Sequence, residues 1–296
     1  MNKSPAVLIL STIFVILLGI FISVAGGQHG ATVLLSSGIF ISVFTLCGAL
    51  IYCINWFFYV PAAIQKTEKY YDLVGSFTYL SVVLVALYFT PELSARAKLV
   101  VFMVIIWAFR LGAFLFIRIH RAGSDDRFDD VKINPLKFLL AWTLQALWVL
   151  LTVACALAII TSHQQPPMSG FAVLGVLLWG VGFVLEVVAD QQKTQFRKDP
   201  ANQNQFISSG LWAWSQHPNY FGEILLWLGV AILSIPVLMS WQYCVLLSPF
   251  FVCLLLIKGS GIPTLKEKAE KRWGNDPSYI EYTQSTPLII PARPKL

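Results

Sequence analysis

The chain contains little charge: Asp, Glu, Lys and Arg make up 12% of its 296 residues, whereas hydrophobic residues make up 57%. This balance excludes a disordered chain and an ordinary soluble domain, because both classes carry far more polar and charged residues. Apolar stretches of roughly 18 to 25 residues, long enough to cross a bilayer, recur along the sequence. We therefore expect an all-α integral membrane protein built as a multi-span helical bundle.

The sequence is also poor in metal ligands and in the common nucleotide-binding motifs. Its five cysteines form no C-x-x-C pair, and its four histidines show no H-E-x-x-H spacing. It has no Walker A motif, no G-x-G-x-x-G after a predicted strand and no G-x-S-x-G elbow. We interpret the cysteines as small hydrophobic residues of the spans, and we expect neither a metal site nor a soluble nucleotide-binding fold.

Eight apolar stretches are predicted to span the membrane, or seven if the last two are continuous. Their approximate bounds are 5–25, 33–60, 72–90, 98–117, 138–161, 171–189, 221–238 and 241–258. With eight spans, all of the 21 basic residues except Arg96, Lys98 and Arg110 fall on one side. The positive-inside rule then places both termini in the cytoplasm, as in a multi-pass protein of the bacterial inner membrane. The net charge of +6 therefore needs no nucleic-acid partner.

The sixth predicted span continues as EVVADQQKTQFRKDP, where Glu186, Asp190, Lys193 and Arg197 are spaced by four, three and four residues. Residues with this spacing share one stripe of a helix. Carboxylates accept hydrogen bonds from sugar hydroxyls, while Lys and Arg bind phosphate oxygens. Ion pairing within the helix is the alternative interpretation. The predicted membrane depth of Glu186 favours a functional site, because ionisable groups are costly there.

The stretch SQHPNYFGEI places a polar cluster at the start of the seventh predicted span. Pro218 is typical of the first turn of a helix, where free backbone N–H groups form an anion or amide site. Asn219 and Glu223 are four residues apart and share a helix face, with Tyr220 beside them. A plain helix cap with an interfacial tyrosine is the alternative, but a cap does not require a carboxylate one turn deeper.

Further polar residues lie within or beside two earlier spans. Asp72, Ser76 and Tyr79 form one polar face on an otherwise apolar helix. Arg110 lies about a dozen residues into its span, where its charge requires a partner or a wet cavity. Arg121 follows just past the end of that span and is a candidate phosphate ligand, although a solvated loop would also account for it.

These motifs, in this order, resemble the steroid 5-alpha-reductase family, including a bacterial branch, and the related sterol reductases. The strongest matches are ADQQKTQFR, GLWAWSQHPNYFGE and RWGNDPSYIEYTQSTPLIIP, and weaker ones are YYDLVGSFTYL and RLGAFLFIRIHRAGSDDRF. The resemblance implies a helical enzyme that holds NADPH at the cytoplasmic ends of its helices. Such enzymes reduce a carbon–carbon double bond conjugated to a ketone, or a sterol double bond. The implied layout is one membrane-embedded domain, with N-terminal spans in 1–65, a catalytic core in 66–265 and a cytoplasmic tail in 266–296.

The resemblance also implies roles for individual residues. The expected cofactor contacts, including neighbours of suitable chemistry, are Arg121, Asp190, Lys193, Arg197, Asn219, Tyr220 and Glu223. The candidate catalytic acid is Asp72, assisted by Tyr71 or Tyr79. Animal steroid reductases differ here, because they carry Gln-Glu at the positions of Tyr71 and Asp72. Independently of the resemblance, the ionisable residues at predicted membrane depth, Arg110 and Glu186, are the expected substrate-side residues. The substrate would be a lipophilic small molecule that enters from the bilayer, among membrane lipids.

Two other classes of protein remain open on the sequence. Isoprenylcysteine and phospholipid methyltransferases also carry His-Pro-x-Tyr followed by Glu, and they bind S-adenosylmethionine at a similar helix start. The cations Arg121, Lys193 and Arg197 favour NADPH, because S-adenosylmethionine carries no phosphate. A membrane scaffold or transporter would leave Glu186, Arg110 and Asp72 without a shared cofactor to offset the cost of their burial.

Overall fold

The computed structural model describes residues 4–122, 128–259 and 261–293, with the side chains of 118–122 outside the described part. Its long helices are α1 (Pro5–Gly26), α2 (Val43–Gln65), α3 (Tyr71–Phe89), α4 (Ala95–Ala122), α5 (Pro135–Ile160), α6 (Gly170–Lys198), α7 (Pro218–Ser234) and α8 (Leu247–Lys258). Two shorter helices follow, α9 (Ile262–Trp273) and α10 (Pro277–Ser285). The 3-10 helices are η2 (Pro200–Asn202), η3 (Gly210–Ala213), η4 (Ile235–Val237) and η5 (Ser240–Leu246).

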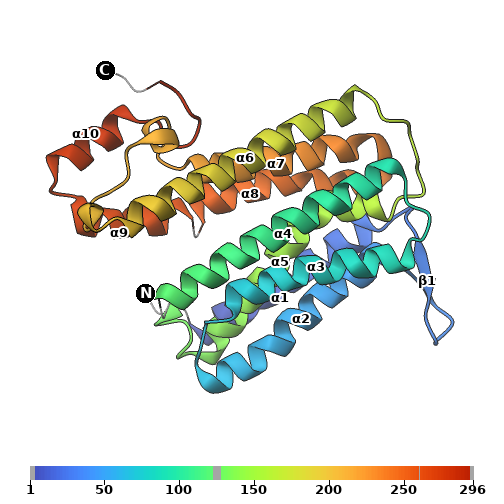
Figure 1. Cartoon of the computed structure of the whole chain (residues 1–296). Coiled ribbons are helices and arrows are strands. Elements are labelled where there is room, and N and C mark those ends of the chain that lie inside the picture. The colour runs from blue at the N-terminus through green and yellow to red at the C-terminus, as the bar shows by residue number, and fades with distance from the viewer. Residues whose placement is uncertain (1–3, 123–127, 260, 294–296) are drawn as a thin grey trace. The chain divides into compact units, whose positions relative to one another are not determined.

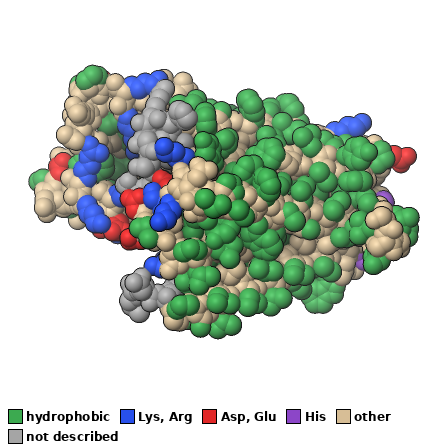
Figure 2. All heavy atoms as spheres, turned by 90° about the horizontal axis from the view of Figure 1, so that it is seen from below, with side chains coloured by type: hydrophobic (Ala, Val, Ile, Leu, Met, Phe, Trp, Pro, Cys, Tyr) green, Lys and Arg blue, Asp and Glu red, His purple; other side chains and the backbone are tan. Residues whose placement is uncertain are grey.

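Within the described residues, eight helical segments are long and apolar enough to cross a membrane. This confirms the predicted multi-span helical bundle. The last two predicted spans are separate, because α7 with η4 ends at Val237 and the last candidate span begins at Ser240. Apolar side chains form a broad surface on the face seen in Figure 2, as the lipid tails around a spanning bundle require. The cytoplasmic location of the termini stays a prediction.

The chain forms two compact units. The first comprises Met1–Ser169 and Leu233–Ser248, and the second comprises Gly170–Ile232 and Pro249–Leu296. The predicted division into 1–65, 66–265 and 266–296 follows different boundaries and stays a prediction about function.

Helix α5 forms the centre of the first unit, where it contacts α1, α2, α3 and α4 (Figure 1). It starts cleanly because Asn134 caps it, accepting hydrogen bonds from the backbone N–H groups of Leu136 and Lys137 at 3.0 and 3.2 Å. Its sequence is apolar all round, and 89% of its most apolar window is buried. A helix without a polar face packs in the interior, which explains the position of α5.

The predicted second span, 33–60, is wrong in its first ten residues. Residues Thr32–Leu34 (β1) and Phe40–Ser42 (β2) pair as a short antiparallel hairpin, and helix α2 begins only at Val43. Gly38 lies in the turn with a φ of +82°, a conformation that glycine adopts without strain. The strands are as apolar as a span, so hydropathy alone extends the helix over them. Ser42 then caps α2 by accepting from the N–H of Thr45 at 3.0 Å.

Helices α6 and α7 of the second unit approach each other through glycines. A Cβ added at Gly182 would lie 2.6 Å from the carbonyl oxygen of Gly222, and one at Gly229 would lie 2.5 Å from that of Gly175. These distances are shorter than ordinary van der Waals contact, so only glycine allows the two backbones to come this close. The contact brings the α7 backbone against Glu186, which is only 3% exposed.

Candidate functional site

The predicted stripe lies on a single helix, because α6 continues without a break from its apolar segment to Lys198. Its residues Glu186 and Asp190 are 3% and 6% exposed. The side-chain amide of Asn219, at the start of α7, donates to Oδ1 of Asp190 at 3.1 Å. The structure therefore brings together the two motifs that the sequence singled out, and it holds the Asp190 carboxylate in one orientation.

Helix α7 begins at Pro218, as its position in the sequence predicts. Glu223 follows Asn219 by one turn on the same face, and both residues are partly buried. The Tyr220 ring stacks on His217, with ring centres 5.5 Å apart and planes inclined by 14°. The polar stretch before α7 thus forms one packed unit with the helix start.

A cavity of about 690 Å³ lies beside this stripe, entirely within the second unit. Its volume falls in the range of small-molecule sites, roughly 300–1,000 Å³. Among the described residues, five cations and one carboxylate belong to its lining: Lys193, Arg197, Lys266, Lys268, Arg272 and Glu270. The excess of positive charge suits an anionic ligand.

The stripe joins the cavity wall through Trp212, which is 3% exposed. Its indole N–H donates to the carbonyl oxygen of Ala189 on α6 at 3.0 Å. The ammonium group of Lys193 lies over the Trp212 ring, 4.3 Å from its centre. This cation–π contact directs the Lys193 side chain along the wall instead of into open solvent. On the other side, the Tyr282 hydroxyl donates to the Trp212 carbonyl oxygen at 2.8 Å.

The C-terminal segment forms the other wall, and none of the predicted site residues belongs to it. Phe206 packs against Trp273, Tyr279 and Tyr282 with ring centres 5.2 to 6.0 Å apart. We call these four residues the aromatic cluster, and all of them line the cavity. Gln216 fixes the segment by donating from its side-chain amide to the carbonyl oxygens of residues 283 and 286 at 3.0 and 2.6 Å. The apolar and cationic periodicity of residues 262–273 was the available signal.

His217 also lines the cavity. Burial, together with the positive charge of Lys193, lowers its pKa to about 4, so the imidazole is neutral at pH 7. Among the described residues, its Nδ1 atom has no hydrogen-bond partner. A buried nitrogen in this condition on a cavity wall is a position where a ligand or a water molecule would restore a hydrogen bond.

The predicted catalytic residues belong to the first unit. Asp72, Tyr71 and Tyr79 all lie on α3, and Ser76 shares its polar face. A Cβ added at Gly112 of α4 would lie 2.8 Å from that of Ser76, so the polar face of α3 packs closely on α4. The ring of Tyr79 packs edge to face on the ring of Trp107, which also lies on α4, with the ring centres 5.0 Å apart.

The remaining predicted residues of the first unit have varied surroundings. The Tyr71 hydroxyl donates to the carbonyl oxygen of Ala141 at 2.9 Å, which ties this side chain to α5. Arg110 is partly buried, and its guanidinium lies 5.4 Å from the ring centre of Phe114. The side chain of Arg121 lies outside the described residues.

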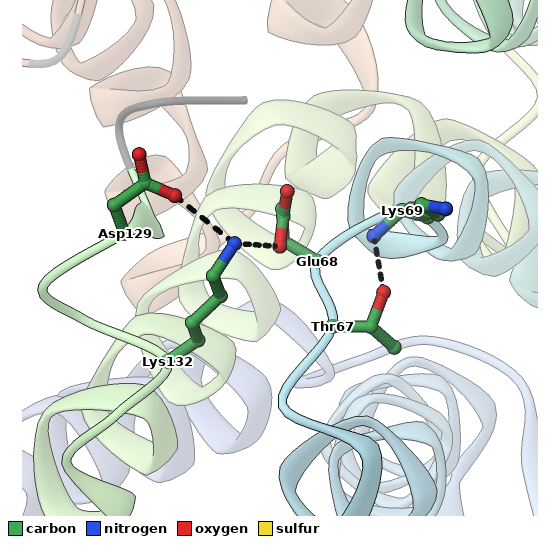
Figure 3. A network of polar contacts seen from close by, with 5 residues as sticks. All are labelled: Thr67, Glu68, Lys69, Asp129 and Lys132. Atoms are coloured by element: carbon green, nitrogen blue, oxygen red, sulfur yellow. Dashed lines mark hydrogen bonds and ion pairs between the residues drawn. The ribbon is translucent and has the colours of Figure 1, made fainter. Parts of the chain in front are cut away.

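An ion-pair network holds the chain just before α3 (Figure 3). The ammonium group of Lys132 lies 2.9 Å from Oε2 of Glu68 and 3.0 Å from Oδ1 of Asp129. The Glu68 side chain is only 3% exposed. The hydrogen bonds to Glu68 and Asp129 raise the pKa of Lys132. The network links the 66–70 loop to the segment before α5 and so fixes the start of the helix that carries Asp72.

Comparison with known proteins gives two matches. Residues 57–286 match the family described as "Protein of unknown function (DUF1295)". The mouse protein Delta(14)-sterol reductase TM7SF2 is 29% identical over 92 residues, which cover 27% of this chain and 22% of that protein. The match thus spans a minor part of this relative's length. No solved structure matches the chain.

Proposed function

We propose that this chain, which belongs to the DUF1295 family, is a membrane-bound reductase that uses NADPH. The proposed reaction is reduction of a carbon–carbon double bond conjugated to a ketone in a steroid-like lipid. The similarity to a mouse protein named as a sterol reductase supports the reaction class. The eight candidate spans support a lipophilic substrate that enters from the bilayer.

The cavity of the second unit is the observation that carries this proposal. Five cations and the aromatic cluster line it, and this combination fits a ligand with phosphates and a planar base. The buried Nδ1 atom of His217, which lacks a partner among the described residues, adds a polar position on the same wall. The residues present therefore fit NADPH.

Each residue of the stripe then has a defined task. Lys193 and Arg197 would bind phosphate oxygens through charge-assisted hydrogen bonds. The Asp190 carboxylate, oriented by Asn219, would accept a hydrogen bond from a ribose hydroxyl. Bound NADPH would supply the hydride, and the chain's own residues would bind and orient it.

We place the substrate side of the reaction on the polar face of α3. Addition of hydride to an enone develops negative charge on the carbonyl oxygen, which a positioned donor stabilises. Asp72, when protonated, or a neighbouring tyrosine hydroxyl can donate this hydrogen bond. The Tyr71 hydroxyl donates to the α5 backbone and the Tyr79 ring packs on Trp107, so either tyrosine remains a candidate assistant of Asp72.

The cavity's charge separates this proposal from a methyltransferase. S-adenosylmethionine carries a sulfonium cation and no phosphate, so the excess of cations among the described lining residues would repel it. The same wall suits the phosphates of NADPH.

Tryptophan fluorescence provides a direct test, since Trp212 and Trp273 both line the cavity. Bound NADPH should quench their emission by energy transfer to the reduced nicotinamide. Lys193→Ala and Arg197→Ala should each weaken binding by about ten- to a hundredfold, the effect of losing one charge-assisted contact. Lys198→Ala is the matched control, because this exposed neighbour is absent from the cavity lining. Saturable binding of S-adenosylmethionine instead of NADPH would reject the proposal.

A further inference from the structure

Helix α9 presents a patterned face to the cavity. The apolar residues Ile262, Leu265 and Ala269 line it and recur at helical spacing. The cations Lys266, Lys268 and Arg272 flank this apolar stripe and also belong to the lining. The outer face carries the exposed ion pair of Lys271 with Glu267, at 2.7 Å, and neither residue lines the cavity. The cations of α9 therefore form a group separate from Lys193 and Arg197 on α6.

Within this group, two contacts orient the side chain of Arg272. Its guanidinium lies over the Trp273 ring, 5.0 Å from the ring centre. Nη2 donates to the side-chain oxygen of Asn204, in the loop opposite α9. A guanidinium has several N–H donors in a planar fork, so this bond uses only part of its capacity. An arginine held between an aromatic ring and an amide is well suited to bind a phosphate with two parallel hydrogen bonds.

The aromatic cluster identifies which end of a dinucleotide would lie beside α9. A purine base stacks on aromatic side chains, and Trp273 belongs both to the aromatic cluster and to α9. The adenosine half would therefore bind next to Arg272. The cations of α6, beside Asp190 and Asn219, are then left for the pyrophosphate.

We infer that Arg272, supported by Lys268, binds the 2′-phosphate of the adenosine ribose and makes the site selective for NADPH over NADH. This inference rests on the proposed function and extends it from the cofactor class to the residue that selects the cofactor. A phosphate monoester carries a charge of about −1.5 to −2 at pH 7, and the ribose of NADH has only a hydroxyl there. The Glu270 carboxylate also lines the cavity, and its Oε1 atom lies 3.6 Å from the Nζ atom of Lys266. This ion pair offsets the repulsion between Glu270 and a bound phosphate.

The test measures the dissociation constants of NADPH and NADH for the purified full-length protein, with 2′,5′-ADP and 5′-AMP as competing fragments. Arg272→Ala should weaken NADPH and 2′,5′-ADP by about ten- to a hundredfold. Its affinities for NADH and 5′-AMP should change by less than about threefold. Arg272→Lys should lie between these limits, because it keeps the charge and loses the fork. Lys271→Ala, on the outer face of the same helix, should bind all four ligands like the wild type.

The possible outcomes separate this inference from the proposed function. Equal weakening of NADPH and NADH by Arg272→Ala, or no weakening of either, overturns the role of Arg272. If Arg272→Ala does not fold, Lys268→Ala decides, and an unchanged ratio of NADPH to NADH affinity then counts against the 2′-phosphate site. A wild-type protein that binds neither NADPH nor NADH overturns the proposed function itself.

Discussion

Gly182 allows a stringent test of how the site is built, because it sits at a close contact of α6 with α7. In Gly182→Ala the new Cβ would lie 2.6 Å from the Gly222 carbonyl oxygen and 2.6 Å from the Leu226 nitrogen. Both atoms belong to the backbone and cannot rotate away. Ordinary contact begins at 3.4 Å, so the helices must separate locally by about 0.8 Å.

The size of the effect follows from this displacement. Overpacking of a tight contact costs about 1–3 kcal/mol. The hydrogen bond from Asn219 to Asp190 bridges the same two helices, and its 3.1 Å distance would stretch past the hydrogen-bonding limit. Gly182→Ala should therefore lower both the free energy of unfolding and the affinity for NADPH, the latter by about tenfold or more.

Gly180→Ala is the control on the same helix. A Cβ at Gly180 meets nothing within 4 Å, so this substitution should stabilise α6 by about 0.5–1 kcal/mol. Unfolding of both variants in detergent, followed by circular dichroism, should show Gly182→Ala about 1.5–4 kcal/mol less stable than Gly180→Ala. Equal stabilities would refute the close contact of α6 and α7.

Three further predictions concern other parts of the molecule. Asp72→Asn should bind NADPH normally but reduce progesterone on the order of a hundredfold more slowly, and near-normal turnover would remove this carboxyl from the mechanism. Lys132→Met leaves the buried Glu68 carboxylate without its ammonium partner and should cost about 1.5–3 kcal/mol in thermal unfolding. By contrast, Lys271→Met breaks an exposed, solvent-screened pair and should lower the stability far less, so equal losses from the two substitutions would contradict the role of burial. Folding lowers the pKa of His217 from 6.5 to about 4, so the folded state binds fewer protons in this window and stability should fall as the pH drops through it. The variant His217→Gln should not lose stability in this pH window. If its stability depends on pH in the same way as that of the wild type, His217 is not the group responsible.

The stripe on α6 was predictable because it depends on local periodicity. Helical spacing alone places Asp190, Lys193 and Arg197 on one face, and α6 has the continuous helix that this requires. The start of α7 was predictable for the same reason, since Pro218 is a local signal. The contact of Asn219 with Asp190 could only be guessed, because it joins residues 29 positions apart.

The cavity wall formed by α9 and the aromatic cluster depends on long-range packing that hydropathy does not contain. Phe206 precedes α7 in the sequence whereas Trp273 ends α9, and nothing local in either segment specifies that partner. The hairpin near Gly38 was missed for a different reason. Its apolar strands satisfy the same hydropathy criterion as a span, and only the turn chemistry of Ser-Ser-Gly distinguishes them.

The identity of the bound nucleotide tests the central claim most directly. The protein should be purified in a mild detergent without added cofactor, then denatured, and the released small molecules quantified by mass spectrometry. A Lys193→Ala, Arg197→Ala double variant processed in parallel controls for adventitious carry-over. The wild type should release NADP or NADPH in far greater amount than this variant. Release of S-adenosylmethionine, or equal traces of NADP from both proteins together with no binding of added NADPH, would contradict an NADPH site in this cavity.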